Sequence, residues 1–163
     1  MLNVIMKGFM GITVNIEELK KMIRRHEGLR LSPYPCSKNH KTLGYGWNLD
    51  AHKLPRSMDA YLNVNGEITE GMAERLLDIS LDTAIRQAWV IFPQFGEFSE
   101  RRQMALVDFL FNVGAGTALT FKKALAAIYK GDWETAADEM TDSRWYRQVK
   151  SRGREIVEMI RKG

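Results

Sequence analysis

Apolar residues recur every three or four positions near the start of the chain, at Ile16, Leu19, Met22 and Ile23. This spacing puts them on one face of a helix, and we expect that helix to span residues 16–26. Asn15 is a favourable N-cap residue. The periodicity stops at Glu27-Gly28, where a glycine commonly follows the end of a helix.

The pattern changes between residues 32 and 62. Proline, glycine and polar residues dominate this segment, with the run Gly44-Tyr45-Gly46 near its centre, and they predict short strands and turns. A β lobe of this size is too small to fold alone. We therefore expect it to be stabilised by the helices on either side of it.

Helical periodicity returns after Asn65-Gly66 and continues to the end of the chain. We expect helices to start after the capping residues Thr69, Ser99, Thr120 and Asp132. A short turn around Trp145 and a last helix near residues 156–161 complete the pattern. One helix, a small β lobe and then a run of helices predict the α+β fold class.

The order of these elements predicts a single domain, which suits a chain of 163 residues. We divide it into an N-terminal extension (1–15), a helix and β lobe (16–66), a long interlobe helix (67–92) and a helical lobe (93–163). A single cysteine cannot form an internal disulfide, so the fold does not depend on an oxidising compartment.

The first 14 residues are mostly apolar, interrupted by Lys7. They are too short to span a bilayer, which takes about 20 apolar residues. They also lack the leading positive charge and the small-residue cleavage site of a signal peptide. We expect them to form an extra strand or helix that packs on the domain, with an export or anchoring role as the alternative.

The net charge is +4, from 24 basic and 20 acidic residues. Such a mild excess fits an anionic partner, whether nucleic acid, a membrane surface or the bacterial cell wall, and does not choose among them. Residues 144–152 interleave basic and aromatic side chains, but one such stretch is weak evidence for nucleic-acid binding, and a solvated helix face explains it as well.

Glu27 is the first candidate for chemistry. A glutamate at a helix end is usually solvated, but this one follows apolar Ile23, precedes Leu29 and leads into the turn-rich β lobe. A carboxyl group that is partly desolvated at such a junction suits a general acid. The three histidines lack the spacing of metal ligands, so we predict neither a metal site nor a cofactor.

Several motifs together resemble phage lysozymes of the T-even type, glycoside hydrolase family 24. The active-site segment of that family resembles Glu27-Gly28-Leu29-Arg30-Leu31, then Tyr34, then Thr42-Leu43-Gly44-Tyr45-Gly46. Further similarity follows at Ile68-Thr69, Phe111-Asn112-Val113-Gly114, Gly131-Asp132-Trp133-Glu134 and Ser143-Arg144-Trp145-Tyr146. The resemblance covers roughly residues 16–161. It implies a lysozyme-like fold with two lobes, a long helix between them and a cleft.

The resemblance also implies roles for individual residues. Glu27 matches the general acid that protonates the glycosidic oxygen, and Thr42 matches the threonine that faces the sugar C1 near the attacking water. Arg152 falls where the family has an arginine paired with the catalytic glutamate. Asn48 and Phe111 match positions that line the saccharide cleft.

Two positions depart from the family pattern. Cys36 stands where the family places an aspartate that helps to activate water. An inverting glycosidase needs a base opposite its acid, and an ordinary thiol, with a pKa near ~8.5, is mostly protonated at neutral pH. A thiolate can still act as a base if Lys38, His40 or Lys41 stabilises it. Trp47 replaces a histidine that is frequent in the family.

Three functions remain open on these grounds. The first is a muramidase that cleaves the β-1,4 bond between N-acetylmuramic acid and N-acetylglucosamine in bacterial peptidoglycan. The second is a lytic transglycosylase, in which the substrate's own C6 hydroxyl attacks and one glutamate suffices. The third is a pseudoenzyme that binds peptidoglycan without cleaving it.

The resemblance further implies the biological setting of a phage or prophage endolysin, although a domain of a larger virion or bacterial protein would show the same pattern. Such an endolysin is made in the host cytoplasm and released to the cell wall through a separate membrane pore. We expect a monomer whose partner is peptidoglycan, with no nucleic-acid partner and no stable insertion into the membrane.

Overall fold

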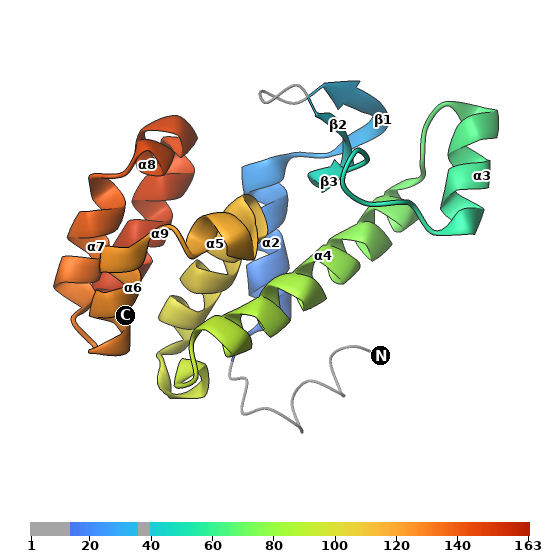
Figure 1. Ribbon diagram of the computed structural model, residues 1–163. Coiled ribbons are helices and arrows are strands. Elements are labelled where there is room, and N and C mark those ends of the chain that lie inside the picture. Colours follow the sequence, from blue (N-terminus) through green and yellow to red (C-terminus); the bar gives the residue numbers. More distant parts are fainter. Residues whose placement is uncertain (1–13, 36–39) are drawn as a thin grey trace. The chain divides into compact units, whose positions relative to one another are not determined.

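The structure is a computed structural model that describes residues 14–35 and 40–163. The first 13 residues, expected to pack on the domain, lie outside this range. The strands are β1 (Arg30–Pro35), β2 (Lys41–Gly44) and β3 (Trp47–Asn48). The helices are α2 (Ile16–Glu27), α3 (Arg56–Asn65), α4 (Glu70–Ile91), α5 (Glu100–Ala118), α6 (Lys122–Tyr129), α7 (Trp133–Thr141), α8 (Arg144–Val149) and α9 (Ser151–Lys162), with a 3-10 turn η1 (Phe95–Glu97) (Figure 1).

These elements confirm the α+β class, and they group into two compact units. The sheet unit comprises the described part of residues 20–82, which holds most of α2, the three strands, α3 and the first half of α4. The helical unit comprises residues 83–163 together with the beginning of α2.

An antiparallel sheet in the order β1-β2-β3 forms the sheet unit's β region. Thr42 lies in the middle strand, opposite Tyr34 of β1 and Asn48 of β3. Leu43, the next residue, is fully buried in a small core with side chains from α3 and α4. Thr42 itself is also buried, so β2 is covered on both faces from Thr42 to Gly44.

Helix α3 corrects the expectation of strands and turns up to residue 62. Pro55 fixes a φ of −53° at the N-cap, which suits a helix start, and Gly66 closes the helix in the left-handed conformation. Met58 and Leu62, four residues apart, face the sheet unit's core. This apolar spacing spans only one helical turn, so the prolines and polar residues around it dominated the sequence pattern and predicted strands and turns.

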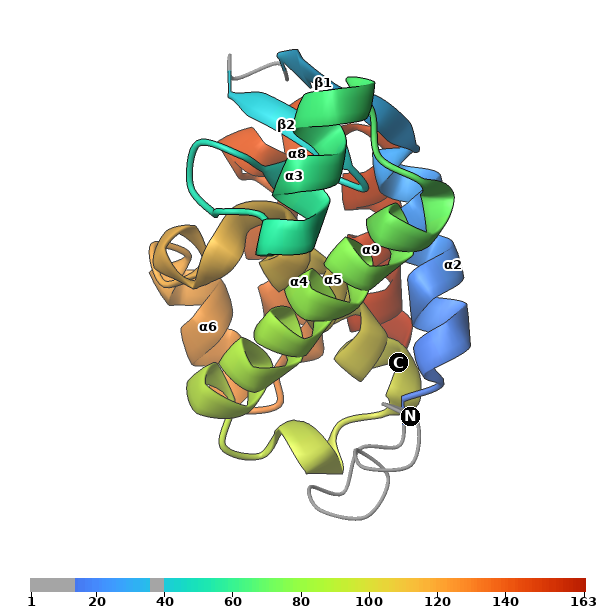
Figure 2. The ribbon, with the colours of Figure 1, turned by 90° about the vertical axis from the view of Figure 1, so that its right-hand side faces the viewer.

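The helix caps agree closely with those predicted from the sequence. The side chains of Ser99 and Asp132 each accept a hydrogen bond from a backbone N–H in the first turn of α5 and α7. Thr69 does the same for α4, and Asn15 for α2. Helix α7 contacts α6, α8 and α9, while α5 packs on α9, and these helices are grouped together in both views (Figures 1 and 2).

Two expectations about the helical unit were wrong in detail. The N-cap of α6 is Phe121, whereas the Thr120 hydroxyl donates to the carbonyl of Thr117 in the turn before it. The region after Trp133 also holds more helix than expected, since α8 and α9 follow each other with only Lys150 between them. Lys150 turns the chain there with a φ of +50°, a conformation that its residue type did not predict.

Among the described residues, no single helix is long and apolar enough to cross a membrane, although the sharply bent pair α5 and α6 passes the same test by length and composition. Seven residues in the first two-thirds of α5 are buried, Gln103 and Asp108 among them.

Candidate active site

Glu27 is the last residue of α2, and its side chain is half-buried. Gly28 ends the helix with a φ of +70°, and its N–H closes the last turn on the carbonyl of Arg24 at 2.9 Å. The chain then enters β1 within two residues. The predicted acid therefore lies at a fixed point, where a rigid helix meets the sheet of its own unit.

The hairpin turn between β2 and β3 lies directly against the Glu27 carboxylate. A Cβ added at Gly46 would be 2.9 Å from Oε2 of Glu27 and 3.2 Å from its Cδ. Gly46 also has a φ of +87°, which L-residues rarely adopt. The turn therefore needs a glycine at position 46 for two independent reasons. The Glu27 carboxylate leaves no room for a Cβ, and the positive φ strains any other residue.

Thr42 is 5% exposed, and its hydroxyl donates a hydrogen bond to the backbone carbonyl of His40 at 3.1 Å. This bond uses the hydroxyl hydrogen and leaves the oxygen lone pairs as acceptors. A water beside Thr42 would therefore donate to Oγ1. Such an acceptor can orient a water molecule but is too weakly basic to deprotonate one.

Asn48 has a structural task in the same hairpin. Its side-chain oxygen accepts hydrogen bonds from the backbone N–H groups of Asp50 and Ala51, at 2.9 and 3.1 Å. The side chain therefore stabilises the turn after β3, and its role in saccharide binding stays a prediction. Trp47, the second departure from the family pattern, is buried in the sheet unit's core, and its ring is tilted by 58° to that of His52 at a centroid distance of 5.6 Å.

Cys36 follows β1 immediately, one residue beyond the Pro35–Lys41 strand pair, and it lies outside the described residues. His40, one of the cations considered beside it, is half-exposed and lies 3.6 Å from Asp50. The role of Cys36 as a base stays a prediction.

In the helical unit, Arg152 begins α9 and is 6% exposed. Its Nε donates to Oδ1 of Asp108 at 3.0 Å, a second guanidinium nitrogen donates to the same oxygen, and Asp108 is completely buried. Sequence reasoning missed Asp108, although an aspartate in the apolar run of residues 105–111 was a usable signal. The predicted pairing of Arg152 with the catalytic glutamate joins residues of different units and stays a prediction.

Phe111, the other predicted cleft residue, is half-buried on α5, one turn after Asp108. Its neighbour Asn112 accepts a hydrogen bond from the Trp145 indole at 2.8 Å, which fastens α8 to this part of α5. Gly114, with a φ of +75° and a ψ of 159°, then breaks the helix, as its place in the motif predicted.

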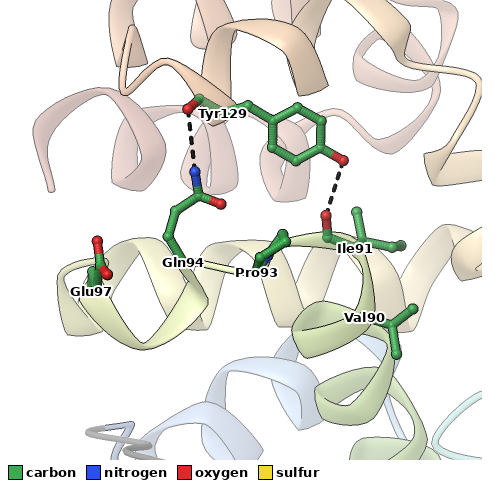
Figure 3. A pocket seen from close by; sticks show the side chains of 6 residues that line it. All are labelled: Val90, Ile91, Pro93, Gln94, Glu97 and Tyr129. Carbon is green, nitrogen blue, oxygen red and sulfur yellow. Dashed lines mark hydrogen bonds between the residues drawn. The ribbon is translucent and has the colours of Figure 1, made fainter.

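A separate hollow of about 720 Å³ opens on the helical unit (Figure 3). Its lining residues are Val90, Ile91, Pro93, Gln94, Glu97 and Tyr129. The Tyr129 hydroxyl donates to the carbonyl of Ile91, and the Gln94 amide donates to the carbonyl of Tyr129. None of the predicted site residues lines this hollow, and two of its polar side chains are engaged with the backbone.

Among residues 14–35 and 40–163, no group of three histidine, cysteine, aspartate or glutamate side chains is arranged to hold a metal ion. The sheet unit offers a carboxyl group on Glu27 and a fixed hydroxyl on Thr42. These groups suit proton transfer to an oxygen leaving group and the orientation of a water.

A helix followed by a small antiparallel sheet and then by a run of helices is the element order expected of a lysozyme-like glycoside hydrolase. The sequence pattern of the phage lysozyme family matches residues 24–162. The chain belongs to this family, and with it to the glycoside hydrolases that act on peptidoglycan.

Individual relatives agree with the family. A probable T4-type lysozyme from Dictyostelium discoideum is 24% identical over 91% of this chain and 96% of its own length. An endolysin from Acyrthosiphon pisum secondary endosymbiont phage 1 is 32% identical over 72% of this chain and 71% of its own length. The pre-baseplate central spike protein Gp5 of phage T4 is 32% identical over 89% of this chain, which spans only 28% of that protein's length.

Proposed function

We propose that the chain hydrolyses the β-1,4 bond between N-acetylmuramic acid and N-acetylglucosamine in peptidoglycan, with Glu27 as the general acid. The observation that carries this proposal is the placement of the Glu27 carboxylate, half-buried at a helix end and backed by Gly46. A general acid must be held in a fixed direction, because proton transfer requires hydrogen-bond reach to the leaving oxygen.

In the proposed reaction, protonated Glu27 gives its proton to the glycosidic oxygen as the bond from that oxygen to C1 breaks. A water attacks C1 from the opposite face, and its oxygen forms the new bond to C1. The fixed Thr42 hydroxyl accepts a hydrogen bond from this water and so orients it. The water's surplus proton leaves to a base, a role that we assign to the Cys36 thiolate.

Mass spectrometry of the products released from purified peptidoglycan tests this proposal. We expect muropeptides with hydrolysed reducing ends from the native chain and none from Glu27→Gln. Glu17→Gln is the matched control, since it makes the same change at an exposed position in the first turn of the same helix. It should release native amounts of product.

Other products would overturn the proposal. Ends in the 1,6-anhydro form would identify a lytic transglycosylase, for which Cys36→Ala should be nearly silent. Binding to peptidoglycan without any released product would identify a pseudoenzyme. If hydrolysis is observed, Cys36→Asp should keep or raise the rate of hydrolysis. A folded Cys36→Asp variant that no longer hydrolyses peptidoglycan would refute a base role for position 36.

We further propose the setting of an endolysin that is made in the host cytoplasm and acts at the cell wall as a monomer. Similarity to an endolysin over most of both chains supports this setting. Fractionation of producing cells before lysis should place the protein with the cytoplasmic enzymes, and light scattering should give the mass of one chain, 18.7 kDa. Recovery in the membrane fraction would contradict the proposed setting.

A further inference from the structure

A cluster of ion pairs connects α2 to α4 within the sheet unit. Arg24 of α2 holds the Glu74 carboxylate with two hydrogen bonds, from Nε at 2.8 Å and from a terminal nitrogen at 2.7 Å. Lys20, one turn earlier, lies 3.3 Å from Glu74 and 2.7 Å from Asp78. Two parallel hydrogen bonds fix the direction of a carboxylate as well as its position.

Burial and charge both mark this cluster as more than a solvated surface. Lys20 is only 8% exposed, and the Glu74 side chain is 31% exposed. The Arg24 hydrogen bonds lower the pKa of Glu74 to about 2, although partial burial opposes them. Burial alone would lower the pKa of Lys20, but the hydrogen bond and charge of Asp78, followed by those of Glu74, outweigh it and raise that pKa.

Glu74 also lies beside the hairpin that backs the proposed acid. Burial raises the pKa of the Tyr45 hydroxyl, and the charge of Glu74 and a hydrogen bond with its carboxylate raise it further. Tyr45 immediately precedes Gly46, whose backbone lies against Glu27. Gly44, on the other side of Tyr45, packs against Ala73, the residue before Glu74.

The spacing of the cations on α2 completes the arrangement. Lys20, Arg24 and Glu27 are four and three residues apart, so they lie along one stripe of the helix. Glu74 binds the first two residues of this stripe, Lys20 and Arg24, and the third residue is Glu27. Helix α4 is therefore connected through Glu74 to the helix that carries the acid, and through Ala73 to the turn that the acid touches.

We propose that Glu74 is a positioning residue for the general acid: by binding Arg24 from α4, the helix that lies against the hairpin at Gly44, it fixes α2 and the hairpin turn at the spacing that directs the Glu27 carboxylate. This inference rests on the proposed role of Glu27. Glu74 itself takes no part in the reaction. Its effect should therefore appear in the rate of the chemical step and not in substrate binding.

The first experiment compares Glu74→Gln with Asp78→Asn, the matched control. Asp78 binds Lys20 on the same pair of helices but makes no described contact with Arg24 or the hairpin. On soluble glycan strands, at a temperature where both variants are folded, we expect Glu74→Gln to lower kcat at least tenfold with KM changed less than twofold. Asp78→Asn should keep kcat within about twofold.

Tyr45→Phe supplies a second variant in case Glu74→Gln does not fold. It removes the hydroxyl whose pKa the charge of Glu74 raises and keeps the ring that packs on the sheet unit's core. We expect kcat to fall severalfold at constant KM. An unchanged kcat in Tyr45→Phe, or equal losses in Glu74→Gln and Asp78→Asn, would overturn the proposal.

A readout that does not need activity separates this inference from the proposed function. The carboxyl carbon of Glu27, assigned in the NMR spectrum by its absence in Glu27→Gln, should shift in Glu74→Gln and stay in place in Asp78→Asn. That result would support the positioning role even if the native chain released no product. A Glu27 signal that is the same in all folded variants would refute it.

Discussion

Substituting Gly46 by alanine tests the placement of the proposed catalytic carboxylate, Glu27, most directly. The added Cβ would lie 2.9 Å from Oε2 of Glu27, where an ordinary contact begins near ~3.4 Å. The turn backbone is constrained on both sides by the β2–β3 pairing of Thr42 with Asn48 and Leu43 with Trp47. The carboxylate at the end of a flexible side chain will therefore move, and we expect it to retreat by about half an ångström.

The expected loss of activity follows from this displacement. A misplacement of about 1 Å can cost ~100-fold in rate, so half of it corresponds to about tenfold, or about 1.4 kcal/mol in the barrier. Stability should fall as well, because alanine at a φ of +87° is strained by about 1–2 kcal/mol. The two effects must be measured separately.

Gly66→Ala is the matched control for the backbone term. Gly66 belongs to the same unit and has a φ of +76°, but a Cβ there would meet no atom within 4 Å. Both variants should lose similar stability in urea unfolding. Initial rates on soluble glycan strands, measured well below the unfolding transition, should fall only in Gly46→Ala. Full activity in folded Gly46→Ala, or an equal loss in Gly66→Ala, would refute the reasoning.

Three further predictions concern stability. The depressed pKa of Glu74 contributes about 2 kcal/mol to the free energy of unfolding above pH ~4.5. This contribution should be lost as the pH falls toward about 2. Urea unfolding of Glu74→Gln should lack this part of the pH dependence. Lys150→Gly should raise the stability by about 1 kcal/mol by relieving the positive φ, seen as a Tm higher by a few degrees; a lower Tm would contradict the strain. Asp108→Asn should cost about 3 kcal/mol in urea unfolding, because the buried Arg152 loses the carboxylate charge that two of its guanidinium nitrogens bind, and a loss below about 1 kcal/mol would show that the charge of Asp108 is unimportant.

Local signals account for the parts of the fold that the sequence predicted well. The caps at Asn15, Thr69, Ser99 and Asp132 each act within three residues of their own position, so a reading along the chain finds them. Glu27 was found for the same reason, since the end of apolar periodicity and the following glycine place it at a helix terminus. Helix α3 was missed because its apolar spacing is one turn long and Pro55 suggested a loop.

The supporting charges could not be predicted in this way. Arg24 binds Glu74 across 50 positions of the sequence, Lys20 binds Asp78 across 58, and Arg152 binds Asp108 across 44. A charged residue at helical spacing is usually solvated, and only the packing of distant segments shows which ones are buried.

The free-energy cost of burying a charged side chain distinguishes the charges that are informative about function. Burying Lys20 to 8% exposure is unfavourable unless partners compensate, and a well-packed apolar residue on α2 would stabilise the same contact at no such cost. An apolar contact, however, would not fix the rotation of the helix about its axis as closely as two parallel hydrogen bonds from Arg24 do. A proton donor needs direction more than affinity. The placement of this cluster on the stripe that ends in Glu27 is therefore best explained by the aiming of that carboxylate.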